Sequence, residues 1–227
     1  MPDKSVLKAK SALTHDTNHY VFSRPDGMQF EPGQAAELAI QKDGWKDAGR
    51  PFTFVSMPSD PDLEFVIKSY PDHDGVTEQL ALLEPGAEVT IDGPFGAIED
   101  QGQEQGPGVF LAAGAGITPF IPILKKRDLD GTLDGTTLIF SNKTAKDIIL
   151  RGQWEAMQGL RTVFAVSDEK ADGLHFGRVD KALLAKEISS FDQKFYLCGP
   201  EGFVDAMRDT LKELGAKHGD IITEDGW

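Results

Sequence analysis

The chain has 227 residues, enough for one or two domains, and its 23 Lys and Arg against 37 Asp and Glu leave a formal charge of −14. This acidity disfavours nucleic-acid binding, because the average field of the protein repels phosphate. No apolar run approaches the ~20 residues that cross a bilayer, and the N-terminus has no apolar signal-peptide core. One Cys cannot form an internal disulfide or hold a cluster, and the spacing of the five His predicts no metal site. We therefore expect a cytoplasmic protein that carries no metal.

The first half of the chain is predicted to form short strands separated by Gly and Pro. The strands are expected at 20–22, 52–56, 63–67 and 88–91, with one short helix at 76–83. Strands at this spacing are typical of an antiparallel barrel. The polar, glycine-rich segment 99–108 then marks a boundary or an exposed loop. We predict two domains, a β-barrel at 1–99 and an α/β domain at 107–227.

The second half alternates strands with helices. Strands are expected at 109–113, 137–140, 162–166 and 195–198. One helix is expected to begin at Pro119 and a second to include Ile148, Ile149, Trp154 and Met157. A third is expected over 204–214, where apolar residues recur at helical spacing. This alternation predicts a parallel sheet with right-handed crossovers, the architecture of nucleotide-binding α/β domains.

Two glycine-bearing turns follow predicted strands of the second half. In the first, Gly114 and Gly116 allow a tight turn, Thr118 can cap the next helix and Pro119 suits its first position. Such a helix start can bind a pyrophosphate, although a connection that binds nothing fits the turn equally well. The second turn is Cys198-Gly199-Pro200, whose lone Cys also fits an inert core residue. Since ligands bind at the carboxyl edge of such sheets, the two turns could form the walls of one cleft.

Six short segments occur in a characteristic order along the chain. They are Arg50-Pro51-Phe52-Thr53, Gly75-Val76-Thr77, Gly93-Pro94-Phe95-Gly96, the turn from Gly114 to Pro119, Cys198-Gly199-Pro200 and the terminal Trp227. In this order they resemble the motifs of the ferredoxin–NADP reductase superfamily, and the resemblance covers nearly the whole chain. It implies a flavin-dependent NAD(P)H oxidoreductase with a flavin-binding barrel and a nucleotide-binding α/β domain.

In the barrel, the resemblance implies that Arg50 pairs with the flavin pyrophosphate and that Phe52 lies against the flavin ring. Thr53 would place its hydroxyl near flavin N5, the atom that accepts hydride. Phosphate or ribose would be held by Ile67, Lys68 and the backbone of Gly75, Val76 and Thr77. The segment from Gly93 to Gly96 would close the barrel. Arg50 and the segment Gly75–Thr77 together suit a pyrophosphate, which favours FAD over FMN.

In the α/β domain, the resemblance implies that Gly114, Gly116, Thr118 and Pro119 receive the pyrophosphate of the nicotinamide nucleotide. Cys198, with Gly199 and Pro200, would lie beside the nicotinamide. Trp227 would cover the flavin face as a gate, and Asp225 is a candidate for influencing flavin protonation. Thr53, Cys198 and Trp227 are therefore the expected catalytic residues.

The choice between NADH and NADPH is expected to depend on the segment after the third strand of this domain. NADPH-preferring relatives commonly place Ser-Arg there, whereas this chain has Ser167 and Asp168. A carboxylate repels a 2′-phosphate and can bond a ribose hydroxyl, which favours NADH. Asn142 and Lys143 are candidates for the adenosine end, and Lys143, Lys170 or Arg178 could still supply charge for NADPH.

The electrons must leave to a separate acceptor, with a ferredoxin, a flavodoxin, an oxygenase component or a small oxidant as candidates. Acidic carriers would be repelled on average by a protein of charge −14, unless basic side chains gather around the flavin edge. The competing interpretation is a non-catalytic flavin- or nucleotide-binding sensor or partner subunit. The sequence has neither the Gly-x-Ser-x-Gly nor the His-Glu-x-x-His motif of hydrolases.

Overall fold

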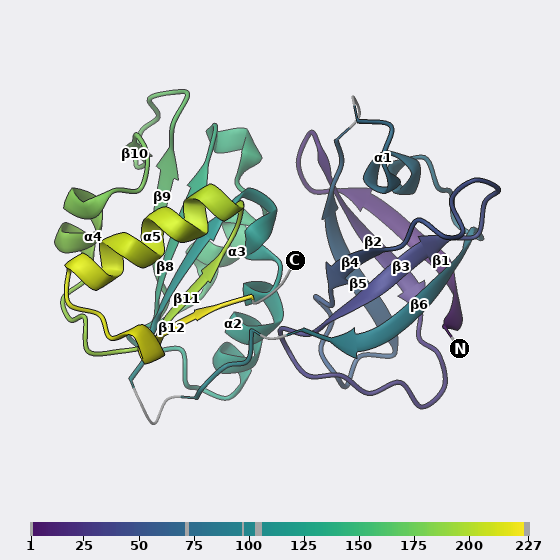
Figure 1. Cartoon of the computed structure of the whole chain (residues 1–227), viewed down its shortest axis with the longest axis horizontal. Helices are drawn as coiled ribbons and strands as arrows, with labels where there is room; N and C mark the ends of the chain where they lie inside the picture. The colour runs from purple at the N-terminus through teal and green to yellow at the C-terminus, as the bar shows by residue number, and fades with distance from the viewer. Residues whose placement is uncertain (1, 71–72, 97, 103–105, 225–227) are drawn as a thin grey trace. The chain divides into compact units, whose positions relative to one another are not determined.

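The computed structural model describes residues 2–70, 73–96, 98–102 and 106–224. The chain divides into two compact units, Met1–Glu99 and Asp100–Trp227. Each contains a six-stranded sheet, antiparallel in the first unit and parallel in the second (Figure 1). This confirms the predicted fold class.

The sheet of the first unit has the strand order β4-β3-β6-β1-β2-β5. Its strands are β1 (Asp3–Ala12), β2 (Thr17–Ser23), β3 (Ala35–Ile40), β4 (Arg50–Thr53), β5 (Asp62–Lys68) and β6 (Glu88–Phe95), and α1 (Val76–Ala81) follows β5. Just after β4, the Val55 N–H donates to the Glu64 carbonyl of β5 at 2.8 Å. The two outer strands therefore meet, and the sheet closes into a barrel.

Aromatic side chains fill the interior of this barrel. Tyr20 and Phe22 alternate along β2, and their rings stack with centroids 6.2 Å apart. Phe54 lies 5.2 Å from Phe65, and all four side chains are fully buried. Because successive residues of a strand point to opposite faces, the i, i+2 spacing of Tyr20 and Phe22 directs both rings to one side of the sheet. The core thereby holds β4, which carries three of the predicted flavin-binding residues.

The sheet of the second unit has the order β10-β9-β8-β7-β11-β12, with every pair parallel. Its strands are β7 (Val109–Ala113), β8 (Thr137–Asn142), β9 (Arg161–Val166), β10 (His175–Phe176), β11 (Phe195–Cys198) and β12 (Ile221–Thr223). The chain runs outward from β7 through β8, β9 and β10, and then returns to place β11 on the other side of β7. The topological switch point, where ligands bind in open α/β sheets, therefore lies between β7 and β11.

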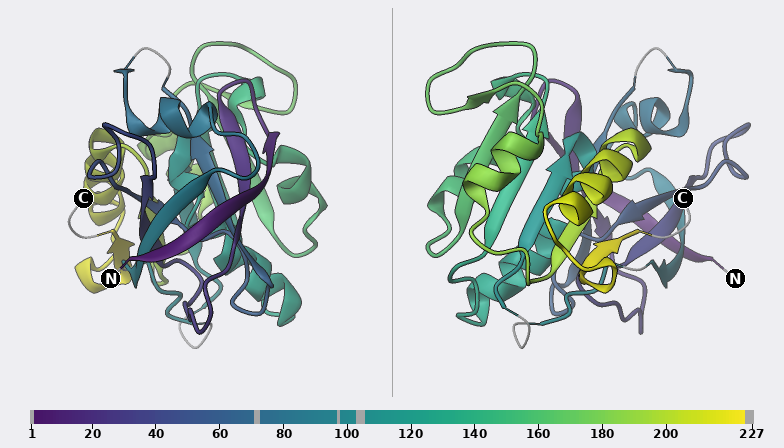
Figure 2. Two further views of the ribbon diagram at one scale, coloured as in Figure 1. Left: turned by 90° about the vertical axis from the view of Figure 1, so that its right-hand side faces the viewer. Right: turned by 60° about the vertical axis from the view of Figure 1, so that its left-hand side comes forward.

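Helices cover both faces of this sheet. They are α2 (Phe120–Leu129), α3 (Arg151–Ala156), α4 (Lys181–Glu187) and α5 (Glu201–Glu213). Leu184 of α4 and Leu211 of α5 share a core cluster with Leu111 of β7, and Figure 2 shows the yellow α5 along this face. The next residue of β7, Phe110, points to the opposite face, where it meets Phe120 of α2 with ring centroids 5.1 Å apart.

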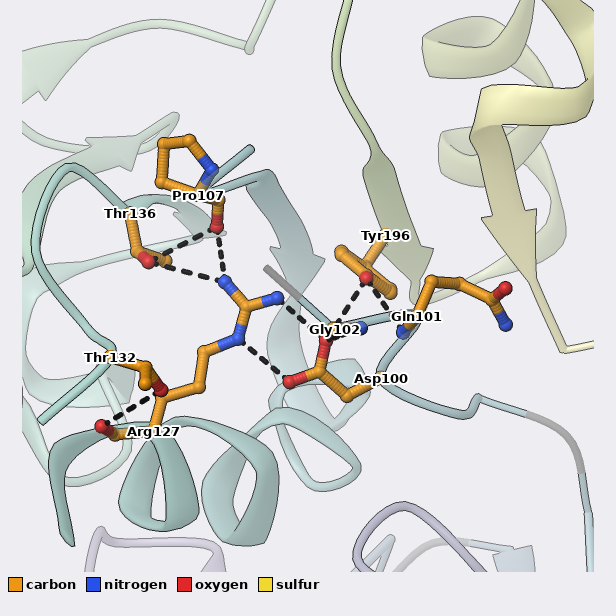
Figure 3. A network of polar contacts seen from close by, with 8 residues as sticks. All are labelled: Asp100, Gln101, Gly102, Pro107, Arg127, Thr132, Thr136 and Tyr196. Carbon is orange, nitrogen blue, oxygen red and sulfur yellow. Dashed lines mark hydrogen bonds and ion pairs between the residues drawn. The ribbon is translucent and has the colours of Figure 1, made fainter. Parts of the chain in front are cut away.

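A buried arginine holds the chain segment that opens the second unit (Figure 3). Arg127 of α2 is 2% exposed, and its Nε and Nη2 donate to Asp100 at 2.7 and 2.6 Å. Its Nη1 donates to the Pro107 carbonyl and, at 3.3 Å, to Thr136 Oγ1. The Tyr196 hydroxyl donates to Asp100 and accepts the Gln101 N–H. Both ends of the predicted boundary segment are therefore fixed to the α/β sheet.

The structure corrects the expected start of α2. The residues after β7 form a 3₁₀ helix, Gly114–Ile117, that runs directly into α2. Thr118 has helical backbone angles, and its hydroxyl donates to the Ala115 carbonyl at 3.0 Å. A capping residue is itself extended, and its side chain accepts an N–H from the first turn of the helix. Thr118 meets neither condition and does not cap α2, whose N-cap position is occupied by Pro119.

The helix predicted around Ile148 and Met157 is shorter than expected. The Thr144 N–H and hydroxyl both donate to Asp147, which stabilises a separate 3₁₀ turn at Ala145–Asp147. Leu150 then takes a left-handed conformation, φ 57°, so that α3 begins only at Arg151. Met157 ends the helix with an extended backbone.

Among the strands and α-helices of the described residues, the sequence does not predict β1, β3, β10, α4 and β12. β1 alternates Lys with small residues because much of it faces solvent, and β3 consists mainly of Ala and Leu, which favour helices. Sheet pairing overrides these preferences. Among the described residues, we find no helix whose length and apolarity would let it cross a bilayer.

Candidate functional site

The two glycine-bearing turns meet at the switch point of the α/β sheet. β7 and β11 are adjacent, with Ala112 paired to Cys198. A Cβ atom on Gly116 would overlap the carbonyl of Cys198, and one on Gly199 would lie 3.0 Å from the Ala113 Cβ. Gly114 has φ +54°, with open space where a side chain would project. The turns therefore need Gly to pack this closely, and they leave backbone accessible at the carboxyl edge of the sheet.

Cys198 ends β11 at this edge and is 8% exposed. Its Sγ lies 3.7 Å from a carboxylate oxygen of Glu224, to which the thiol donates. Burial, reinforced by the Glu224 charge and hydrogen bond, raises the pKa of the Cys198 thiol well above its usual value. The side chain is thus a neutral thiol, suited to contact an uncharged ring rather than to act as a nucleophile.

A second group of predicted residues meets where β8 and β9 end. The Ser167 N–H donates to the Asn142 carbonyl at 3.2 Å, and the Asp168 N–H donates to the Lys143 carbonyl at 2.9 Å. The Ser167 hydroxyl bonds the Asp168 carboxylate at 2.6 Å. The structure therefore brings together all four residues assigned to the adenosine end. Asp168 and Lys143 are exposed at this edge.

Asn142 differs from its neighbours because its side chain is only 8% exposed. Neither its Nδ2 nor its Oδ1 has a hydrogen-bond partner in the described part of the chain. An unsatisfied buried polar group costs on the order of 1–3 kcal/mol, so native proteins rarely leave two such atoms unpaired. The amide is therefore available to a ligand that reaches the ends of β8 and β9.

The predicted flavin-binding residues of the barrel lie on β4 and beyond β5. Arg50 begins β4 and is exposed, and its one hydrogen bond in the described structure goes to the Gly49 carbonyl at 2.9 Å. Phe52 packs partly buried against the barrel core, and Thr53 is 8% exposed at the end of the strand. β4 thus presents a guanidinium with unused donors two residues from an aromatic ring.

The residues around α1 divide into core and accessible groups. Ile67 and Val76 belong to the barrel core, so only their backbones are available to a ligand. The Lys68 ammonium forms an ion pair with Asp16 at 2.8 Å, which neutralises part of its charge. Gly75 is the N-cap of α1 and has no side-chain capping bond, and a Cβ atom there would approach only the His73 carbonyl, at 3.9 Å. Thr77 lies in the first turn of α1 and is half-buried.

Gly93 lies in β6 where its antiparallel pairing with β3 shifts register. A Cβ atom on it would come within 2.9 Å of the Ala36 Cβ, so this close approach of the two strands requires Gly. The predicted gate Trp227 and the candidate Asp225 lie outside the described residues.

Two acidic residues were missed by sequence reasoning. Glu224 contacts Cys198, and Glu169 accepts the Ala145 N–H at 2.5 Å after β8. Glu169 adjoins the Ser167-Asp168 segment already singled out, which could have directed attention to it. No spacing rule joins Glu224 to a cysteine 26 residues away.

Comparison with known families identifies both units. The family described as Oxidoreductase FAD-binding domain matches residues 4–99, and the family described as Oxidoreductase NAD-binding domain matches residues 110–209. The chain therefore carries an FAD-binding and an NAD-binding domain, one in each unit.

The similar proteins span the same two domains. NADH-cytochrome b5 reductase 1 of Aspergillus terreus is 30% identical over 229 residues, which cover 92% of this chain and 77% of that protein. The CS-b5R domains of human Ncb5or in an NAD+ form are 27% identical with a TM-score of 0.87, over 98% of this chain and 69% of that one. The flavohem-like FAD/NAD binding domain of a Vibrio cholerae nitric oxide dioxygenase shares the fold, with a TM-score of 0.88 at 24% identity over 98% of this chain and 97% of that one. With both domains matched and a relative this similar along most of its length, the chain belongs to the ferredoxin–NADP reductase superfamily of FAD- and NAD-binding oxidoreductases.

Proposed function

We propose that this protein is an FAD-dependent reductase that oxidises NADH in preference to NADPH and passes electrons to a separate acceptor. The observation that carries the proposal is the carboxyl edge of the α/β sheet. There the Gly116 turn packs against Cys198 at the switch point, and Asp168 follows β9. A nicotinamide nucleotide needs backbone access at the first position and a ribose-binding carboxylate at the second.

The described residues fit both cofactors. Gly114 leaves open space, because a Cβ atom there would meet nothing within 4 Å, and the buried Asn142 amide has no hydrogen-bond partner in the described residues. In the barrel, Arg50 has donors left for a pyrophosphate, and Gly75 leaves the start of α1 open. We assign FAD to Arg50, Phe52, Thr53, the backbones of Ile67, Gly75 and Val76, Lys68 and Thr77. We assign the nicotinamide nucleotide to Gly114–Pro119, Asn142, Lys143, Ser167, Asp168 and Cys198–Pro200.

When bound, FAD would supply the redox chemistry, since a flavin can take up a hydride and give up single electrons. The side chains need supply no strong acid or base, so their role is positioning. Cys198 offers a neutral, buried wall for the nicotinamide ring, and its raised pKa keeps a thiolate charge away from the hydride. Thr53 places a small hydroxyl at the end of β4, where we assign the flavin ring edge. Trp227 remains the proposed gate.

The nucleotide preference is tested by kcat/KM for NADH and NADPH with the FAD-loaded protein. We expect NADH to be favoured at least about tenfold, because Asp168 repels the 2′-phosphate that only NADPH carries; this ratio corresponds to ~1.4 kcal/mol. Equal values, or a preference for NADPH, would contradict the assignment of Asp168. A protein that binds FAD but that neither nucleotide reduces would favour the non-catalytic alternative.

The charge of the barrel unit bears on the acceptor. Residues 1–99 hold eight Lys and Arg against 17 Asp and Glu, a formal charge of −9. Among the described residues of the unit, four of the basic side chains form ion pairs, at Lys8, Lys10, Lys46 and Lys68. Little positive charge is left to attract an acidic carrier, so we propose an acceptor whose docking surface is neutral or basic.

This choice is tested by supplying saturating NADH and comparing an acidic ferredoxin with a basic haem protein as acceptor at low and high salt. We expect the rate with the basic protein to fall with salt and that with ferredoxin to rise, because salt screens attraction and repulsion alike. A ferredoxin rate that falls with salt would refute the proposed acceptor class and point to a basic patch near the flavin.

A further inference from the structure

The turn after β8 uses its hydrogen-bond donors on carboxylates of the chain itself. The Thr144 N–H and hydroxyl donate to Asp147 at 2.8 and 2.6 Å. The next N–H, that of Ala145, donates to Glu169 at 2.5 Å. These donors lie directly after Lys143, whose carbonyl accepts the Asp168 N–H. Three successive donors beside the proposed adenosine end are therefore already bonded to internal anions.

Donors of this kind are what a 2′-phosphate requires. A phosphate dianion is held by backbone N–H groups and cations, and it gains little where a carboxylate already occupies the N–H. Glu169 both occupies the Ala145 N–H and places a negative charge one residue from Asp168. Asp147 is 8% exposed and its carboxylate completes the capping box of the 3₁₀ turn, so its substitution would disturb the turn. Glu169 is therefore the carboxylate whose effect on the nucleotide can be tested by substitution.

The cations near this turn do not cancel that effect. Lys170 lies over the Phe176 ring at 5.2 Å, which holds its ammonium on β10. Lys143, Lys146 and Arg178 are exposed and so are screened by solvent. Glu169 is half-buried, so solvent screens its charge less than it screens these exposed cations.

We propose that Glu169 is a second specificity-determining residue, which excludes 2′-phosphorylated nucleotides by occupying the Ala145 N–H and by charge repulsion. The inference rests on the proposed preference for NADH and extends it. It predicts that Asp168 alone does not account for the rejection of NADPH.

The test measures binding of two probes, 5′-AMP and 2′,5′-ADP, by calorimetry to the FAD-loaded protein. The variants separate the two effects of Glu169. Glu169→Gln keeps an oxygen acceptor for the Ala145 N–H but removes the charge, whereas Glu169→Ala removes both. Glu213→Gln, which alters an exposed carboxylate of α5 paired with Lys181, controls for net charge.

We expect the ratio of Kd values, 2′,5′-ADP over 5′-AMP, to fall about tenfold in Glu169→Ala, which corresponds to ~1.4 kcal/mol. The fall should be smaller in Glu169→Gln and absent in Glu213→Gln, and 5′-AMP affinity should change less than about twofold. The NADPH to NADH ratio of kcat/KM should rise in parallel.

Two failures can be told apart. If wild-type protein binds 2′,5′-ADP more tightly than 5′-AMP, the proposed NADH preference itself is wrong. If it prefers 5′-AMP and both Glu169 variants keep the wild-type ratio, only the role of Glu169 is refuted. Should Glu169→Ala lose affinity for both probes through a distorted turn, Glu169→Gln decides: an unchanged ratio there refutes the charge repulsion.

Discussion

Replacement of Arg127 by Met tests the network that fixes the start of the α/β unit. Met retains an apolar stem that can pack on the Phe110 ring, over which the guanidinium lies at 5.1 Å. The substitution removes the paired bonds to Asp100 and leaves the Pro107 carbonyl without its Arg127 donor. Because Arg127 is 2% exposed, water cannot replace these contacts without opening the structure.

The expected loss follows from the burial of the two partners. Breaking a buried ion pair by removing one member costs ~3–5 kcal/mol. The Asp100 side chain is 26% exposed and regains some hydration, so the lower end, about 3 kcal/mol, applies. For a unit of this size that loss lowers the melting temperature by about 10 °C.

The effect should depend on pH in a defined direction. Burial opposes ionisation of Asp100, but the hydrogen bonds and charge of Arg127 outweigh it and lower the pKa below its usual 3.8. A carboxyl whose pKa is depressed in the folded state stabilises the fold above the unfolded pKa of about 3.9, and this stability is lost as the pH falls through the folded value. The difference between wild type and variant should therefore shrink below about pH 4.

Calorimetric unfolding of the FAD-loaded protein measures this, with Arg208→Met as the matched control. Arg208 forms an i,i+3 ion pair with Asp205 at 2.8 Å on the surface of α5, and such pairs are worth under ~1 kcal/mol. A variant at Arg127 that unfolds within about 1 kcal/mol of wild type would refute the assigned role of the network.

Three further substitutions or reactions probe the nucleotide edge. Gly116→Ala should destabilise the α/β unit by roughly 1–3 kcal/mol and raise the KM for NADH, because the added Cβ atom would overlap the Cys198 carbonyl. The control is Gly202→Ala in α5, where a Cβ atom meets nothing within 4 Å, and this variant should be neutral or stabilising. Thermal unfolding and steady-state kinetics check both, and a Gly116→Ala protein equal to wild type contradicts the packing. At mildly alkaline pH, Cys198 of the native protein should react with a thiol reagent about a hundredfold more slowly than Cys198 of the unfolded protein, since burial and Glu224 raise the pKa of its thiol. Equal labelling rates would show that the thiol is exposed or ionised. Asn142→Leu should stabilise the nucleotide-free protein by about 1 kcal/mol, because it removes two buried polar atoms that have no partner in the described residues. The same variant should bind 5′-AMP more weakly in calorimetry, because a ligand would satisfy those atoms. A variant that binds 5′-AMP as wild type does would argue against a ligand contact.

The sequence predicts the strands that are buried on both faces and the turns that Gly enforces. Val109–Ala113 and Phe195–Cys198 read as buried strands because they are uniformly apolar, and the structure places them side by side. Strands that face solvent, such as β1, carry no such signal. Their existence depends on pairing with distant partners, which local preference does not encode.

Contacts made by single side chains across long stretches of sequence were the hardest to predict. Arg127 and Asp100 lie 27 residues apart, and neither residue stands in a recognisable motif. The pairing of Asp168 with Lys143 through backbone was predictable in outline, because both follow adjacent parallel strands. The bond from Ala145 to Glu169 depends on the geometry of the 3₁₀ turn at Ala145–Asp147, which the sequence did not predict.

The central claim is that the bound flavin receives hydride from NADH. Anaerobic addition of NADH to the FAD-loaded protein, followed by the visible absorbance of the flavin, tests it directly. We predict that one equivalent of NADH bleaches the flavin fully within a single turnover and that an equivalent of NADPH does so much more slowly. A protein that takes up FAD but keeps its flavin absorbance with excess NADH would contradict the account.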